Sequence, residues 1–131
     1  MLWFTFAMGL LIPVAMVACY PVFVHRSHGE PNSWSGYRSP LAMKNTRNWR
    51  EANRLCGRYW LRWGIGFGLA CLLVFVALFA SGNRVVGVWE TTSLVLAGLG
   101  LVAMAVPALL VERRLVEFDA SADASTSSAA R

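Results

Sequence analysis

The sequence predicts an all-α integral membrane protein with three transmembrane helices and a cytoplasmic amphipathic helix that leads into the second of them. Hydrophobic residues make up 56% of the 131 residues and charged residues only 15%, a balance too apolar for an ordinary soluble domain of this length. Three segments without Asp, Glu, Lys or Arg are also long enough to cross a hydrocarbon core of roughly 30 Å. These segments are residues 2–24, 63–81 and 91–111.

The first segment, residues 2–24, is expected to be an uncleaved span. No basic residue precedes its apolar run, and the run exceeds the roughly 7–15 residues of a signal-peptide core. Pro13 and Pro21 each remove a backbone donor, so the sequence predicts a bent first helix.

The connection over residues 25–62 contains the predicted amphipathic helix. On a helix over residues 46–63, the arginines gather opposite a stripe formed by Trp49, Asn53, Cys56, Trp60 and Trp63. Asn45 or Thr46 can cap its first turn. Aromatic residues favour the headgroup zone and arginines favour anionic lipid, so this helix is expected to lie on the inner leaflet before turning into the second span. Binding of nucleic acid or of an acidic protein is the alternative for such a basic helix, and the membrane anchor accounts for its charges without a partner.

The second and third spans carry small residues. Gly64 and Gly68 form a GxxxG pair, which indicates either a close helix contact or a chance occurrence in a glycine-rich span. Pro107 lies near the end of the third span, and Glu90 and Glu112 flank it as solvated interfacial residues. We expect the three spans to pack into one bundle.

The basic residues predict the orientation. Eight Lys and Arg residues lie in residues 25–62, whereas Arg84 alone lies in residues 82–90. The positive-inside rule therefore places the first connection and the C-terminus in the cytoplasm and the N-terminus outside. Residues 1–118 form the membrane module, and residues 119–131 lack large apolar side chains and are expected to be a disordered cytoplasmic tail.

Reactive groups are scarce, so the sequence predicts no enzyme, no metal and no cofactor. His25 and His28 are the only histidines, and with Glu30 they supply too few ligands for a convincing metal site. The glycines of "GIGFG" lie inside a span rather than between a strand and a helix. The three cysteines are expected to be small packing residues.

The loop pattern "N…GYRSPLAMKNTRNWREANRLCGR" resembles the SdpI family, bacterial membrane proteins named after the immunity protein against the sporulation-delaying toxin. The resemblance covers roughly residues 5–112. The founding immunity protein is longer and has additional spans ahead of this region. The matching positions, which we take as candidate binding or motif residues, are Asn32, Gly36, Tyr37, Arg38, Ser39, Pro40, Asn45, Trp49, Asn53 and Gly57.

The resemblance implies a multi-pass protein of the bacterial inner membrane that confers immunity to a membrane-active toxic peptide or takes part in a related envelope signal. Its expected partners are the lipid bilayer, a toxic peptide, and a cytoplasmic regulator or another membrane subunit, with no direct nucleic-acid contact. The alternative is a small accessory subunit of a larger membrane complex, without toxin-binding activity of its own.

Overall fold

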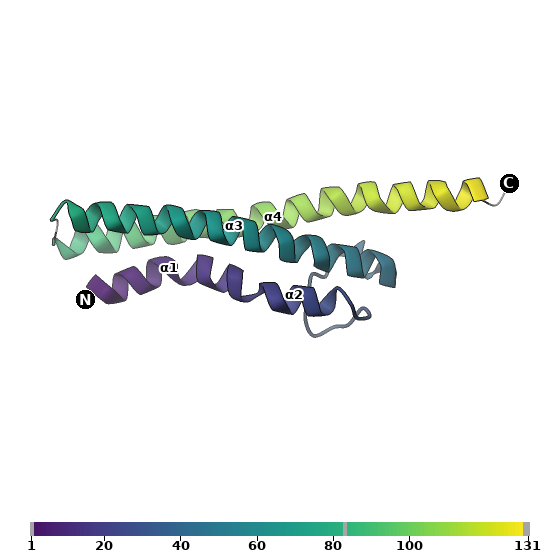
Figure 1. Ribbon diagram of the computed structural model, residues 1–131, viewed down its shortest axis with the longest axis horizontal. Helices are drawn as coiled ribbons and strands as arrows, with labels where there is room; N and C mark the ends of the chain where they lie inside the picture. The colour runs from purple at the N-terminus through teal and green to yellow at the C-terminus, as the bar shows by residue number, and fades with distance from the viewer. Residues whose placement is uncertain (1, 83, 130–131) are drawn as a thin grey trace. The chain divides into compact units, whose positions relative to one another are not determined.

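The computed structural model describes residues 2–82 and 84–129, and these residues form helices and loops without a β-strand. The elements are α1 (Leu2–Ala18), α2 (Tyr20–Arg26), the short 3-10 helix η1 (Ala42–Lys44), α3 (Thr46–Ala80) and α4 (Val86–Ala129). Figure 1 labels the α-helices. Three helical stretches are long and apolar enough to cross a membrane, Trp3–Arg26, Thr46–Ala80 and Val86–Ser128. The predicted all-α class and the count of three spans are therefore confirmed.

The first apolar stretch is interrupted at Cys19, between α1 and α2. Pro21 follows two residues later and has no N–H to donate to the carbonyl of Val17, so the regular helix cannot continue unbroken at this point. Pro13, by contrast, lies inside α1 without ending it.

Helix α3 corrects the expectation of a separate surface helix. It runs without interruption from Thr46 to Ala80, so the predicted amphipathic segment and the second span belong to one helix. Trp49, Asn53 and Cys56 of the predicted stripe are buried against protein, whereas Trp63 is exposed. The buried face packs on the neighbouring loop because its polar atoms find backbone partners there, as described below.

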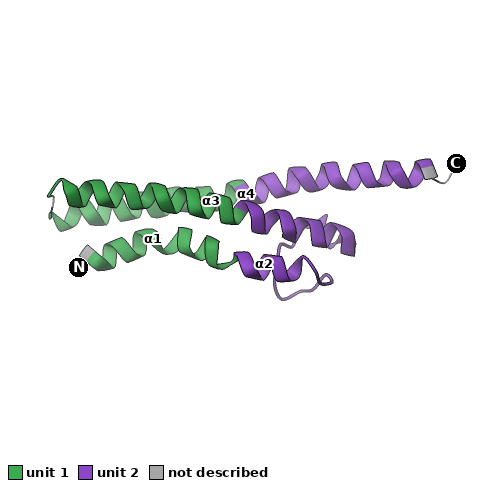
Figure 2. Cartoon of the chain, in the orientation of Figure 1, with its two compact units in different colours: residues 1–19, 60–106 green, residues 20–59, 107–131 purple. Residues whose placement is uncertain are grey.

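The chain divides into two compact units, coloured separately in Figure 2. Unit 1 comprises residues 1–19 and 60–106, and unit 2 comprises residues 20–59 and 107–131. Each unit is described by itself.

Unit 1 has an aromatic and apolar core that includes Cys71, Phe75, Trp89 and Leu96. Two glycines of α3 lie directly against α1. A Cβ on Gly64 would be 3.0 Å from the Cβ of Met16, and a Cβ on Gly68 would be 3.3 Å from the Cβ of Pro13. The predicted GxxxG pair is therefore a helix contact, since only glycine permits this approach without displacing α1.

The structure differs from the expected disordered tail, because α4 continues to Ala129. The hydroxyls of Ser125 and Thr126 donate to the carbonyl of Ala122 within this last part of the helix. Asp119 adds contacts to another segment of unit 2 that composition alone does not reveal. Beyond Asp119 the side chains of residues 123–128 are all exposed, so this last part makes little packing contact.

Candidate functional site

The loop that follows α2 is folded by its own polar groups. The Asn32 Oδ1 accepts hydrogen bonds from the backbone N–H groups of Trp34 at 3.0 Å and Ser35 at 3.1 Å, which is an Asx turn. Arg38 closes the same turn by donating from its guanidinium to the carbonyl of Ser33. The turn leaves the side chain of Trp34 89% exposed.

Asn53 of α3 ties this loop to the helix. Its Oδ1 accepts the backbone N–H of Tyr37 at 2.8 Å, and its Nδ2 donates to the carbonyl of Trp49 at 2.9 Å. Gly36 has φ +106°, and a Cβ there would lie 2.6 Å from the Asn53 Oδ1. Both the backbone angle and the close approach therefore require glycine at this position.

Trp49 is fully buried and ties α3 to the end of α2. Its indole Nε1 donates to the carbonyl of Arg26 at 3.1 Å. One residue on, the Nε of Arg50 donates to the carbonyl of Gly29 at 3.2 Å. Further along α3, a Cβ on Gly57 would lie 3.2 Å from the Cβ of Phe23, so α2 and α3 approach closely here.

Tyr37 connects the loop to α4. Its hydroxyl donates to the Oε2 of Glu112 at 2.9 Å and lies 3.2 Å from the carbonyl oxygen of Ala108. Burial, followed by the hydrogen bond to the Glu112 carboxylate, raises the pKa of Tyr37 well above its usual range. The phenol therefore stays protonated and remains a donor. Glu112 is thus a hydrogen-bond acceptor inside unit 2 and not the simply solvated residue expected from the sequence.

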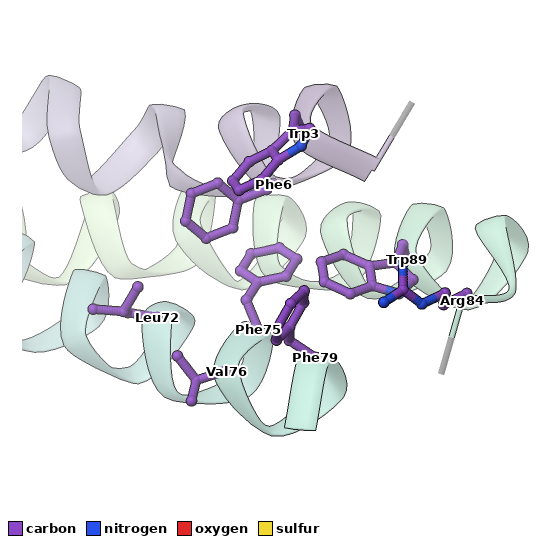
Figure 3. Close-up of a pocket in the computed structure, with 8 residues that line it drawn as sticks. All are labelled: Trp3, Phe6, Leu72, Phe75, Val76, Phe79, Arg84 and Trp89. Carbon is purple, nitrogen blue, oxygen red and sulfur yellow. The ribbon is translucent and has the colours of Figure 1, made fainter. Parts of the chain in front are cut away.

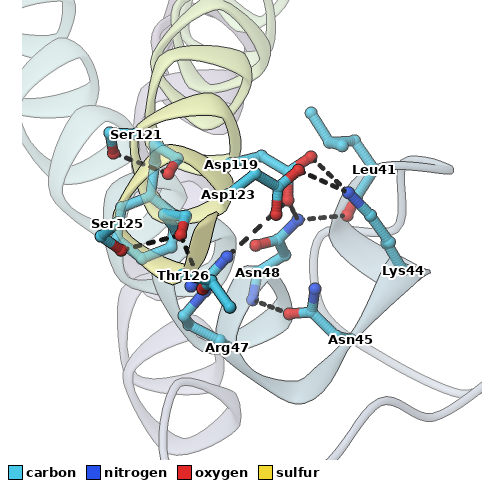
Figure 4. Close-up of polar contacts among 12 residues, drawn as sticks. Leu41, Lys44, Asn45, Arg47, Asn48, Asp119, Ser121, Asp123, Ser125 and Thr126 are labelled. Atoms are coloured by element: carbon cyan, nitrogen blue, oxygen red, sulfur yellow. Dashed lines mark hydrogen bonds and ion pairs between the residues drawn. The ribbon is translucent and has the colours of Figure 1, made fainter. Parts of the chain in front are cut away.

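A second polar cluster consists of Lys44, Asn48 and Asp119 (Figure 4). The Lys44 ammonium donates to the Asp119 Oδ2 at 2.7 Å, and the Asn48 Nδ2 donates to the Asp119 Oδ1 at 2.9 Å. These two hydrogen bonds lower the pKa of Asp119, and the carboxylate raises the pKa of Lys44 in return. The Arg47 guanidinium lies 5.3 Å from the ring centre of Phe118 beside this cluster.

The remaining predicted residues begin helices. Asn45 caps α3, since its Oδ1 accepts the backbone N–H of Asn48 at 2.7 Å. The Ser39 Oγ accepts the N–H of Ala42 at 3.1 Å and so begins η1. Pro40 is exposed between them.

The structure therefore brings most of the predicted residues together in unit 2, where they hold the loop between α2, α3 and α4. Their polar atoms bond to one another and to backbone groups, an arrangement suited to fixing a loop. Sequence reasoning missed Asn48, Glu112 and Asp119. For Asn48 a signal existed, because on a helix it lies one turn before Ala52, which borders the stripe that begins with Trp49 and Asn53. For the two acidic residues no spacing rule relates them to a loop more than 70 positions away.

The three apolar helices define the class of this chain as a multi-pass α-helical membrane protein. The family model described as the SdpI/YfhL protein family matches residues 29–111, a range that includes all ten predicted motif residues. The chain therefore belongs to the SdpI/YfhL family. Searches of curated proteins and of solved structures found no match.

Proposed function

We propose that this SdpI-family membrane protein protects a bacterial cell against a membrane-active toxic peptide. The family match over residues 29–111 carries the proposal, because it spans the motif loop together with the second and third apolar helices. In this proposal the membrane helices shield the bilayer from the peptide or bind the peptide itself. No enzymatic reaction is involved.

In the proposed orientation the N-terminus lies outside and the motif loop and the C-terminus lie in the cytoplasm. The excess of basic residues before the second span supports this orientation. In that arrangement unit 2 offers a folded cytoplasmic surface, with the exposed Trp34 at its loop, to a regulator or another subunit. An exposed tryptophan on an ordered turn is suited to such a contact.

Survival of a sensitive host challenged with candidate toxic peptides tests the proposal. The wild-type protein is expected to raise survival over an empty vector. Arg38→Lys is expected to lower it, because a lysine does not reproduce the planar guanidinium that closes the loop on Ser33. Arg58→Lys is the matched control, since Arg58 is exposed on α3 and has no carboxylate within 4 Å among the described residues.

Membrane abundance must be equal across these variants for the comparison to hold. Unchanged survival with the wild-type protein against every peptide, together with a stoichiometric partner after purification in mild detergent, would instead support the accessory-subunit role.

Labelling of single cysteines with an impermeant reagent tests the orientation, in a background without Cys19, Cys56 and Cys71. We expect cysteine at exposed Gly87 to react in intact cells and cysteine at exposed Met43 to react only after lysis. Reaction of position 43 in intact cells would overturn the orientation.

A further inference from the structure

Unit 1 contains a pocket at the end where α1 begins, α3 ends and α4 begins (Figure 3). Its volume is about 400 Å³, which falls within the roughly 300–1,000 Å³ of ordinary ligand pockets. The residues of the motif loop take no part in it. It is therefore a second candidate site, independent of the loop described above.

Aromatic rings form the wall of this pocket. Phe6 and Phe75 meet edge to face at 5.2 Å, and Phe75 and Trp89 stack at 5.7 Å. Phe75 and Trp89 are only 2% and 4% exposed, whereas Trp3 and Phe79 are 81% and 68% exposed. The inner wall is thus packed in place, and the outer wall is accessible from the surface of the unit.

Arg84 supplies the charge at this pocket. It belongs to the connection between α3 and α4, lines the pocket and is exposed. Among residues 2–82 and 84–129, no carboxylate lies within 4 Å of its guanidinium, and Glu90 of the first turns of α4 is exposed to solvent. A cation beside an apolar wall complements a ligand with an anionic head and an apolar tail.

We propose that this pocket binds an anionic phospholipid, with one acyl chain against the aromatic wall and the headgroup phosphate on Arg84. The pocket lies at the ends of helices apolar enough to span a membrane, which is where phosphate groups and tryptophans meet. A guanidinium binds a phosphate through charge-assisted hydrogen bonds.

The lining favours a lipid over an apolar peptide. Apart from Arg84, the polar groups of the lining side chains are the indole N–H groups of Trp3 and Trp89. A peptide brings backbone N–H and C=O groups, and each of them costs free energy when it is buried without a partner. An acyl chain has no such groups, so it fits this wall without unpaired donors or acceptors.

Thermal unfolding of the purified protein in a neutral detergent tests the proposal, because a ligand that binds the folded state raises Tm. We expect phosphatidylglycerol to raise Tm more than phosphatidylcholine, and inorganic phosphate alone to have no effect. In Arg84→Gln, the apparent affinity for phosphatidylglycerol should fall at least about tenfold, the factor expected for one charge-assisted hydrogen bond. Arg84→Lys should retain part of the preference.

Two variants serve as checks. Arg113→Gln removes an exposed arginine outside the pocket and should keep the full preference for phosphatidylglycerol. Phe79→Ala shortens the exposed wall and should weaken binding of both lipids without changing Tm in detergent alone. Equal Tm shifts from the two lipids, or an equal loss in Arg84→Gln and Arg113→Gln, would overturn the proposal. A Tm increase with an apolar peptide and none with phosphatidylglycerol would overturn it as well, and would assign the pocket to peptides.

Discussion

In unit 1 the helices pack mainly through glycines and aromatic rings, with the Ser93 Oγ also donating to the carbonyl of Thr5 at 2.8 Å. In unit 2 a network of hydrogen bonds ties the loop to α3 and α4. A Cβ at Gly64 of unit 1 would lie only 3.0 Å from the Cβ of Met16. Asn53 of unit 2 instead bonds both Tyr37 and Trp49. Apolar surface gains nothing by leaving lipid for a helix interface, so close packing must hold unit 1 together. Unit 1 should therefore be sensitive to added volume and unit 2 to lost side chains.

The largest effect is expected from Trp49→Ala in unit 2. Trp49 is fully buried, and its removal leaves a cavity and breaks the hydrogen bond from its indole to the carbonyl of Arg26. Loss of a buried tryptophan costs about 3–5 kcal/mol of the free energy of unfolding, so Tm in detergent should fall strongly. Trp34→Ala is the matched control, and an equal fall in both variants would contradict the structure of unit 2.

Gly64→Leu tests the corresponding claim for unit 1. A side chain at position 64 must displace Met16 or Val17 of α1, and such overpacking costs about 1–3 kcal/mol. Gly66→Leu adds the same side chain to α3, but a Cβ at Gly66 meets nothing within 4 Å. Both variants replace a helical glycine by leucine and gain the same helix propensity, so the difference between their Tm values reports the contact with α1 alone. If Gly66→Leu were the more damaging, the contact between α1 and α3 would be wrong.

Tyr37→Phe removes one hydrogen bond of unit 2 and keeps the ring. The loss of the contact with Glu112 should cost about 0.5–1.5 kcal/mol at neutral pH. Because folding raises the pKa of Tyr37, its contribution is fully present below the unfolded pKa of about 10 and is lost as the pH rises above it. The difference in Tm between the wild-type protein and Tyr37→Phe should therefore shrink at alkaline pH. A difference that grows there would show that the phenol is not the donor.

Asp119→Asn should have a smaller effect, visible mainly through pH. Folding lowers the pKa of Asp119, so its contribution is present above the unfolded pKa of about 3.9 and is lost as the pH falls below it. Acid unfolding curves should show a weaker pH dependence in Asp119→Asn than in the wild-type protein. Asp123→Asn is the control, since the Asp123 carboxylate is exposed and lies 3.6 Å from Lys44. Equal acid unfolding curves for the two variants would show that Asp119 does not form the contacts with Lys44 and Asn48.

The smallest effect is expected from deleting residues 120–131. Most of the described side chains in this range are exposed, so Tm should stay within error of the wild-type value. Extending the deletion by one residue removes Asp119 and should lower Tm measurably. A marked loss from the shorter deletion would show that the end of α4 is structural.

The sequence predicts the three spans and limits the cap of α3 to Asn45 or Thr46, because apolar length and capping chemistry are local properties; the structure selects Asn45. The sequence does not predict which part of α3 is covered by protein. The basic, aromatic pattern of residues 46–63 suits a leaflet surface equally well, and only the partners of Trp49 and Asn53 show that protein covers this face. The sequence also does not predict Glu112 and Asp119 as hydrogen-bond acceptors, because their donors Tyr37 and Lys44 are brought close only by the tertiary fold. Composition likewise favours disorder after residue 118, because it carries no information about the ion pair between Asp119 and Lys44.

The length of α4 has a consequence for the electric field at the basic end of its apolar segment. The helix has 44 residues, about 66 Å at a rise of 1.5 Å per residue, which is more than twice the roughly 30 Å of a hydrocarbon core. A helix ending at the headgroups would present its last four unpaired carbonyls there, together with the negative end of its macrodipole. In α4 that end lies about 25 Å further along, at 1.5 Å for each residue from Arg113 to Ala129. The carbonyls at the end of α4 are therefore more than a Debye length from Arg113 and Arg114, and they do not reduce the positive potential around these two guanidinium groups.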